Sequence, residues 1–183
     1  MSTVYTTYTD DALASEVTRV RNAGKGHPIR ISNSQNSDIK KITYSLTFDS
    51  DTCINVYFEM NDGAAYDGHF YIVGLDNNQY WFADTSTPHE YSTGETLTME
   101  KMSDGRYRVK ISGINAQHLD NEYDFNVVTE VTSGTDSYTA SVNVTGLSYV
   151  YSLTADGKDA DTKKAAVAIF RYYEEASKYA GNS

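Results

Sequence analysis

The stretch most able to do chemistry is Tyr80-Trp81-Phe82, followed by a polar loop that carries His89 and Tyr91. Sugar-binding faces use flat aromatic rings beside polar side chains, because a ring covers the C–H face of a pyranose. If residues 80–82 alternate as a strand, Tyr80 and Phe82 face one way and Trp81 the other, so one face carries an aromatic ring outward. The alternative is that all these rings pack in a core. The sequence thus predicts a ligand contact at Tyr80, Trp81, His89 and Tyr91.

Acidic side chains gather at two places, Asp49 with Asp51 and a second group ahead of the C-terminal segment. The second group contains Asp156, Asp159 and Asp161. Calcium takes roughly six to eight oxygen ligands at set offsets, which is more than either group supplies. Two interpretations therefore remain for the second group, a calcium site or a solvated turn that caps a helix.

Other catalytic signatures are missing from the sequence. His27, His69, His89 and His118 lack the spacing of a metal motif. There is no nucleophile elbow, phosphate-binding glycine loop or Cys/His motif. A carboxylate pair for glycoside hydrolysis is left open, because such a pair forms in space and not in sequence. We predict that the protein is not an enzyme and that it needs no cofactor unless calcium binds.

The candidate residues fall within a long region of alternating apolar and polar side chains. This period of two is typical of half-buried strands, and turn signals separate the runs every 8–12 residues or so. Turns are expected at 61–63, 103–105 and 132–136, and residues 85–93 are expected to be a polar loop. We predict an antiparallel, immunoglobulin-like β-sandwich of about eight strands. The expected strands are 42–48, 54–60, 70–73, 79–83, 97–99, 107–111, 123–127 and 138–144.

The C-terminal segment Asp161–Gly181 is expected to be a helix, because its apolar residues recur at spacings of three and four. We expect Asp161 to cap it and Glu174 to pair with Lys178. A short helix at Leu147–Leu153 would precede it. The aromatic stripe of the Asp161–Gly181 helix must pack on another part of the protein, and we expect the preceding β-structure to supply that surface. The prediction is an α+β fold in which a C-terminal pair of helices packs on a sandwich.

The N-terminal residues 1–37 are expected to be a separate segment. Asp10 or Asp11 is placed to cap a short helix that runs to about Asn22, and a polar loop or linker follows at Ser32–Asp38. Residues 38–183 are then expected to form one compact unit containing the sandwich and the C-terminal helices.

Composition narrows the class of protein. The chain has 183 residues and a net charge of −10, and both nucleic acid and anionic membrane need clustered Lys and Arg that such a chain lacks. It has no apolar run long enough for a membrane helix and no signal-peptide pattern. With one cysteine, Cys53, it has no internal disulfide. The 16 tyrosines among many Thr, Ser, Asn and Asp residues are common in secreted β-rich modules.

Several packing residues between positions 40 and 181 recur in a distinctive order and spacing. These are Ile54–Met60, Tyr107–Ile111, Ile114, Ala116, Leu119, Tyr123, Gly146–Ser152, Lys164, Ala165, Tyr172, Tyr173, Ala176 and Tyr179. In this order and spacing, residues 40–181 resemble a module found near the C-termini of large secreted or cell-surface proteins of gut-type anaerobic Gram-positive bacteria.

The resemblance implies an extracellular or cell-surface location, an accessory role and neighbouring modules in a longer parent chain. It implies no reaction. We therefore expect a non-catalytic module with an adhesion, spacer or assembly role. The alternative is a carbohydrate-binding module that uses aromatics around Trp81. Its partner would be a glycan or another surface protein.

Overall fold

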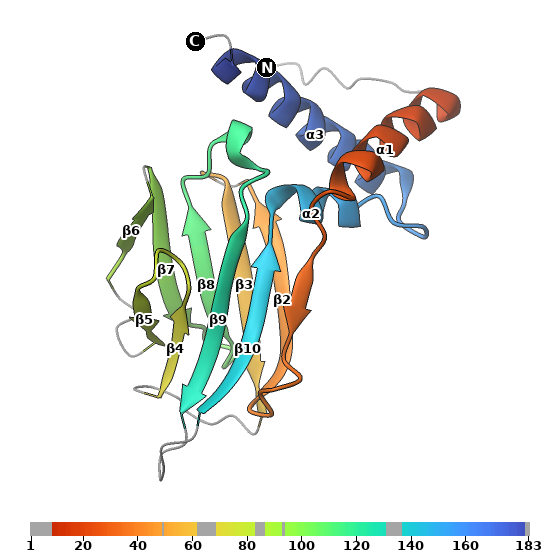
Figure 1. Cartoon of the computed structure of the whole chain (residues 1–183). Helices are drawn as coiled ribbons and strands as arrows, with labels where there is room; N and C mark the ends of the chain where they lie inside the picture. The colour runs from red at the N-terminus through yellow and green to blue at the C-terminus, as the bar shows by residue number, and fades with distance from the viewer. Residues whose placement is uncertain are drawn as a thin grey trace.

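The computed structural model describes residues 9–48, 50–61, 69–82, 87–92, 94–130 and 137–181. Among these residues, α-helices lie at both ends of the chain order and the strands lie between them (Figure 1). In chain order the elements are α1 (Asp10–Gly24), β1 (Arg30–Ser32), β2 (Ile39–Thr47), β3 (Cys53–Met60), β4 (Phe70–Val73), β5 (Gln79–Trp81), β6 (His89–Ser92), β7 (Glu95–Lys101), β8 (Tyr107–Ser112), η3 (Ala116–His118), β9 (Tyr123–Glu130), β10 (Ser137–Val144), α2 (Gly146–Ser152) and α3 (Ala160–Gly181).

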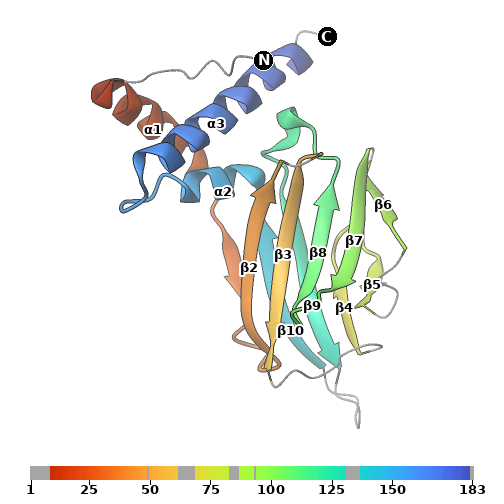
Figure 2. The same cartoon turned by 180° about the vertical axis from the view of Figure 1, so that it is seen from behind.

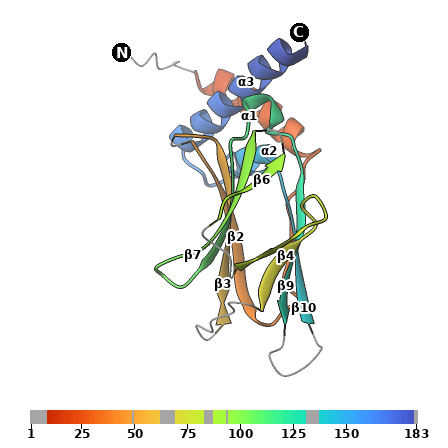
Figure 3. The same cartoon turned by 90° about the vertical axis from the view of Figure 1, so that its left-hand side faces the viewer.

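The strands form two antiparallel sheets of five strands each within the described residues. The strand order is β1-β10-β9-β4-β5 in one sheet and β2-β3-β8-β7-β6 in the other. The two sheets face each other as layers (Figure 3), and their inner faces supply the core. Phe58 of β3 meets Phe70 of β4 edge-on across the layers, with ring centroids 5.9 Å apart. The predicted β-rich α+β class is confirmed, and the immunoglobulin-like assignment stays a prediction.

The described part of the chain contains ten strands, where the sequence predicted about eight. The two extra strands are β1 and β6, and both lie at sheet edges. β1 is only three residues long and pairs with β10. β6 was predicted to be part of a polar loop, because its residues lack an apolar alternation. Backbone pairing to β7 makes it a strand all the same.

The turn between β7 and β8 has the predicted Asp-Gly geometry. Gly105 has a positive φ of 88°, and the Asp104 carboxylate accepts a hydrogen bond from the Arg106 amide at 3.0 Å. The turns predicted at 61–63 and 132–136 lie wholly or partly outside the described residues.

The helices gather at one end of the sandwich, as both broad views show (Figures 1 and 2). α2 follows β10 directly and begins with a capping box between Thr145 and Ser148. Phe170 of α3 is 7% exposed. α3 packs on α1, α2 and η3. The expectation that the sheet would cover the helical stripe is therefore wrong, because the two sheets already cover each other.

Two local predictions about α3 are also corrected. Asp159 and not Asp161 caps the helix, because the Thr162 amide donates to Asp159 Oδ1 at 2.7 Å. Glu174 pairs with Arg19 of α1, and Lys178 pairs with Glu175 at 3.2 Å, so the predicted pair of Glu174 with Lys178 does not form.

The N-terminal residues contribute to the same core as the sandwich. α1 is capped by Thr9, ahead of the two aspartates that were expected to do so. Val20 of α1 is 2% exposed within the main cluster of buried residues. Asn36, in the stretch expected to be a loop or linker, is 1% exposed and donates to the Tyr138 carbonyl at 3.0 Å. These contacts tie α1 and β1 to the helical end and to β10.

We expect Gly24→Ala to destabilise the protein, although alanine is the better helix former by up to about 1 kcal/mol. A Cβ at Gly24 would lie 2.3 Å from Cβ of Tyr151, where α1 meets α2. Urea unfolding should show a loss of about 1–3 kcal/mol, typical of overpacking. Gly26→Ala is the control, since its Cβ would meet nothing closer than the Ala23 carbonyl at 3.7 Å. Equal stability of the two variants would contradict the close helix approach.

Candidate functional site

The structure brings three of the four residues predicted to form a ligand contact together between the sheets, Tyr80, His89 and Tyr91, and places Trp81 apart from them. Tyr80 of β5 is 8% exposed and faces the interior, as does Phe82 at 1%. Trp81 lies between them on the opposite, outward face of the sheet and is half-buried. His89 and Tyr91 are on β6 of the other sheet and are also half-buried. Of the four residues, Trp81 is therefore the one on the outward face.

Trp81 has an aromatic neighbour that sequence reasoning missed. Tyr71 of β4 is its direct cross-strand partner, and the two ring centroids lie 4.4 Å apart at 39°. Val128 of β9 is paired with Tyr71 on the other side. We call Tyr71, Trp81 and Val128 the Trp81 face. The signal for Tyr71 was present in the sequence, because alternation along β4 buries Phe70 and Ile72 and turns Tyr71 outward.

Polar side chains border the Trp81 face. Asn126 and Glu130 flank Val128 along β9 and point outward with it. Glu130 is two residues beyond Val128, the cross-strand partner of Tyr71, and burial followed by the charge of Glu130 raises the pKa of Tyr71 above its ordinary value. The sheet that contains β4, β5 and β9 lies in front in Figure 1. The face therefore combines two adjoining rings with an amide and a carboxylate.

Tyr80 belongs to a different group, between the sheets. Its hydroxyl donates to the Asp76 carboxylate at 3.0–3.1 Å, and its ring lies 5.0 Å from that of His89. Asp76 has a positive φ of 51° in the β4–β5 loop, which turns its carboxylate back toward β5. Burial, followed by this hydrogen bond, raises the pKa of Tyr80.

A second phenol–carboxylate pair lies beside the first. Tyr123 of β9 donates to Glu95 of β7 at 2.9 Å, and both residues are buried. The Tyr91 ring lies 6.1 Å from that of Tyr123, and burial followed by the charges of Glu95 and Asp76 raises the pKa of Tyr91. These hydrogen-bonded phenols stay protonated at neutral pH. The Tyr123–Glu95 hydrogen bond joins the two sheets, whereas the Tyr80–Asp76 hydrogen bond stays within one sheet.

The residues predicted to bind calcium are all exposed. The Thr162 amide holds the pKa of Asp159 below its ordinary value, as expected of a helix cap. Asp156 and Asp161 join it in no metal-binding group. Over the described ranges, no cluster of three or more His, Cys, Asp or Glu side chains could hold a metal ion. Asp49, of the other acidic pair, lies outside those ranges.

Comparison with known proteins identifies no relative of this chain. No protein-family model, no curated protein and no solved structure matches the chain. Among the described helices, none is both long and apolar enough to span a bilayer.

We expect Tyr123→Phe to lower the free energy of unfolding by about 2 kcal/mol, the usual cost of losing a hydrogen bond to a charged group. The variant removes only the hydroxyl that Glu95 accepts from. Urea unfolding measures the loss. Tyr179→Phe, at a residue 79% exposed, should change stability negligibly. An equal effect of both variants would show that the buried pair contributes nothing specific.

We expect stability to fall as pH rises above about 10, where phenols of the unfolded chain ionise. Burial raises the pKa of Tyr44 to about 12 and raises that of Tyr123 as well. The unfolded chain then releases protons that the folded chain keeps, so the stability present below pH 10 is lost as pH rises. Urea unfolding at pH 9, 10 and 11 should show the decline, and Tyr123→Phe should make it shallower. A flat profile to pH 11 would contradict the burial of these phenols.

Proposed function

We propose that the protein is a non-catalytic module of a bacterial secreted or surface protein and that it recognises a glycan through the Trp81 face. The observation that carries this proposal is the pair formed by Tyr71 and Trp81 on an outward sheet face. An aromatic pair at this position adds little to the core. It offers a ready apolar surface to the C–H face of a sugar ring.

The surroundings of the pair suit a polar ligand. Asn126 and Glu130 can exchange hydrogen bonds with sugar hydroxyls while the rings cover the apolar face. Both rings lie on paired strands, so their positions are held before a ligand arrives. A rigid scaffold of this kind reduces the entropy lost on binding.

A non-catalytic role accounts for the titratable groups between the sheets. The carboxylates of Asp76 and Glu95 accept hydrogen bonds from tyrosines whose pKa values are raised. Protonated phenols serve well as structural donors and poorly as bases at neutral pH. The extracellular location and the neighbouring modules of a parent chain rest on the resemblance of residues 40–181 to surface modules. An adhesion role follows if the glycan belongs to a host or a neighbouring cell.

The one tryptophan of the chain gives a direct assay, because its fluorescence reports only on the Trp81 face. We expect a glycan array probed with the whole chain to give a hit that changes tryptophan emission in solution. Tyr71→Ala should weaken that binding about tenfold or more, as loss of a central aromatic contact does. Trp81→Ala should weaken glycan binding to a similar extent, and calorimetry measures its binding because this variant has no tryptophan.

Tyr179→Ala is the matched control, since this tyrosine is exposed on α3 at the helical end. It should bind the same glycan as the unmodified chain. The glycan proposal fails if the array gives no hit, or if a hit survives both Tyr71→Ala and Trp81→Ala. A spacer or assembly role without a sugar ligand would then remain.

A further inference from the structure

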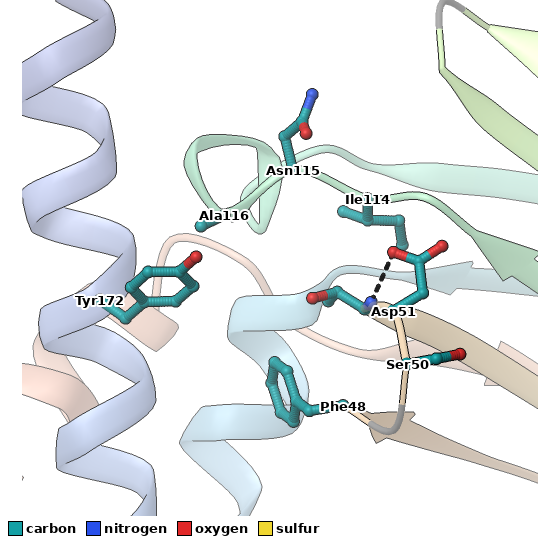
Figure 4. Close-up of a pocket in the computed structure, with 8 residues that line it drawn as sticks. Phe48, Ser50, Asp51, Ile114, Asn115, Ala116 and Tyr172 are labelled. Atoms are coloured by element: carbon teal, nitrogen blue, oxygen red, sulfur yellow. Dashed lines mark hydrogen bonds between the residues drawn. The ribbon is translucent and has the colours of Figure 1, made fainter. Parts of the chain in front are cut away.

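A hollow lies at the helical end of the sandwich, away from the Trp81 face (Figure 4). It has a volume of about 350 Å³ and opens between the β2–β3 turn, η3 and α3. Its lining is Phe48, Ser50, Asp51, Thr52, Ile114, Asn115, Ala116 and Tyr172. Ligand sites usually span about 300–1,000 Å³, so this hollow suits a single side chain better than a sugar chain.

Two exposed aromatic rings stand at the hollow. Phe48, directly after β2, is 42% exposed, and Tyr172 of α3 is 61% exposed. Figure 4 shows the Tyr172 ring reaching toward Ala116, with Phe48 on the neighbouring wall. These rings come from distant parts of the chain and leave apolar surface in water at one place. Apolar surface left in water does not stabilise the fold, and where it gathers at one place it often marks an interaction site.

The charge at the hollow has one sign. Among the lining residues that the structure describes, Asp51 is the only charged side chain, and none is Lys, Arg or His. One of its oxygens accepts from the Thr52 amide at 2.8 Å, and Figure 4 shows the other turned away from that amide. The turn is also held by the Ile114 amide, which donates to the Thr52 carbonyl at 3.2 Å. Two hydrogen bonds therefore hold the backbone of Thr52, next to this carboxylate.

We infer that this hollow binds the cationic side chain of a Lys or Arg residue on a protein partner. A cation gains from the carboxylate and from the negative face of an aromatic ring, and both are present here. The protein's net charge of −10 attracts basic partners over distance. This site is independent of the Trp81 face and takes a different class of ligand.

The test is an NMR titration of the whole ¹⁵N-labelled chain with N-acetylarginine amide. N-acetylcitrulline amide is the matched probe, because it has nearly the same shape and no charge. The arginine probe should shift the amides of Ser50, Asp51, Thr52 and Ala116, and the citrulline probe should not. Raising the salt concentration should weaken binding of the arginine probe, since ions screen an exposed charge pair.

Three variants separate the site from general charge effects. Asp51→Asn keeps an oxygen that can accept from the Thr52 amide and removes the negative charge. This variant should therefore fold normally and bind the arginine probe more weakly. Tyr172→Ala should weaken it about two- to fivefold, the range for an exposed cation–aromatic contact. Tyr179→Ala, on the same helix and outside the hollow, should leave it unchanged.

The inference is overturned if citrulline and arginine probes bind alike, or if Asp51→Asn binds arginine as the unmodified chain does. It is also overturned if a neutral sugar produces the shifts at these amides. None of these outcomes bears on the Trp81 face, whose readout is tryptophan emission.

Discussion

Each of the two sheets has one apolar face that water solvates poorly, and the rest of the structure depends on each face covering the other. Aromatic rings make much of that contact. Phe70 stacks on Phe82 with centroids 4.1 Å apart within one layer, and Tyr107 of the opposite layer meets both rings edge-on. Such pairs add about 0.5–1.5 kcal/mol each beyond the burial of their area.

The inner faces of the sheets cover each other, and the helices meet the sheets at one end of the sandwich, where the Tyr149 ring of α2 lies 5.8 Å from the Tyr44 ring of β2. The helices also pack on one another there, with α1 from the N-terminal part against α2 and α3 from the C-terminal part. Charged pairs border this contact, with Glu16 bound to Arg171 at 3.2 Å and the guanidinium of Arg19 lying 5.6 Å from the Phe170 ring centroid. The helical end thus ties the two ends of the chain together, and it places Tyr172 beside the β2–β3 turn.

The same constraint separates the two proposed binding surfaces. Alternation along β4 and β5 puts every second aromatic ring into the core, which leaves Tyr71 and Trp81 on the outer face. The hollow at the helical end arises instead where a turn, a short helix and α3 meet without filling the space between them. The Trp81 face therefore arises from alternation within one sheet, and the hollow arises where separate elements meet.

Local periodicity in the sequence determined the position of most strands, α2 and α3, because a period of two or 3.6 residues depends only on near neighbours. It also determined that Trp81 and Tyr80 face opposite ways. Tertiary structure alone decided that Tyr71 adjoins Trp81, that the polar residues of β6 form a strand, and that Glu174 pairs with Arg19. Each of these depends on contacts between residues far apart in the chain, and the pattern of any single stretch carries no record of its partner.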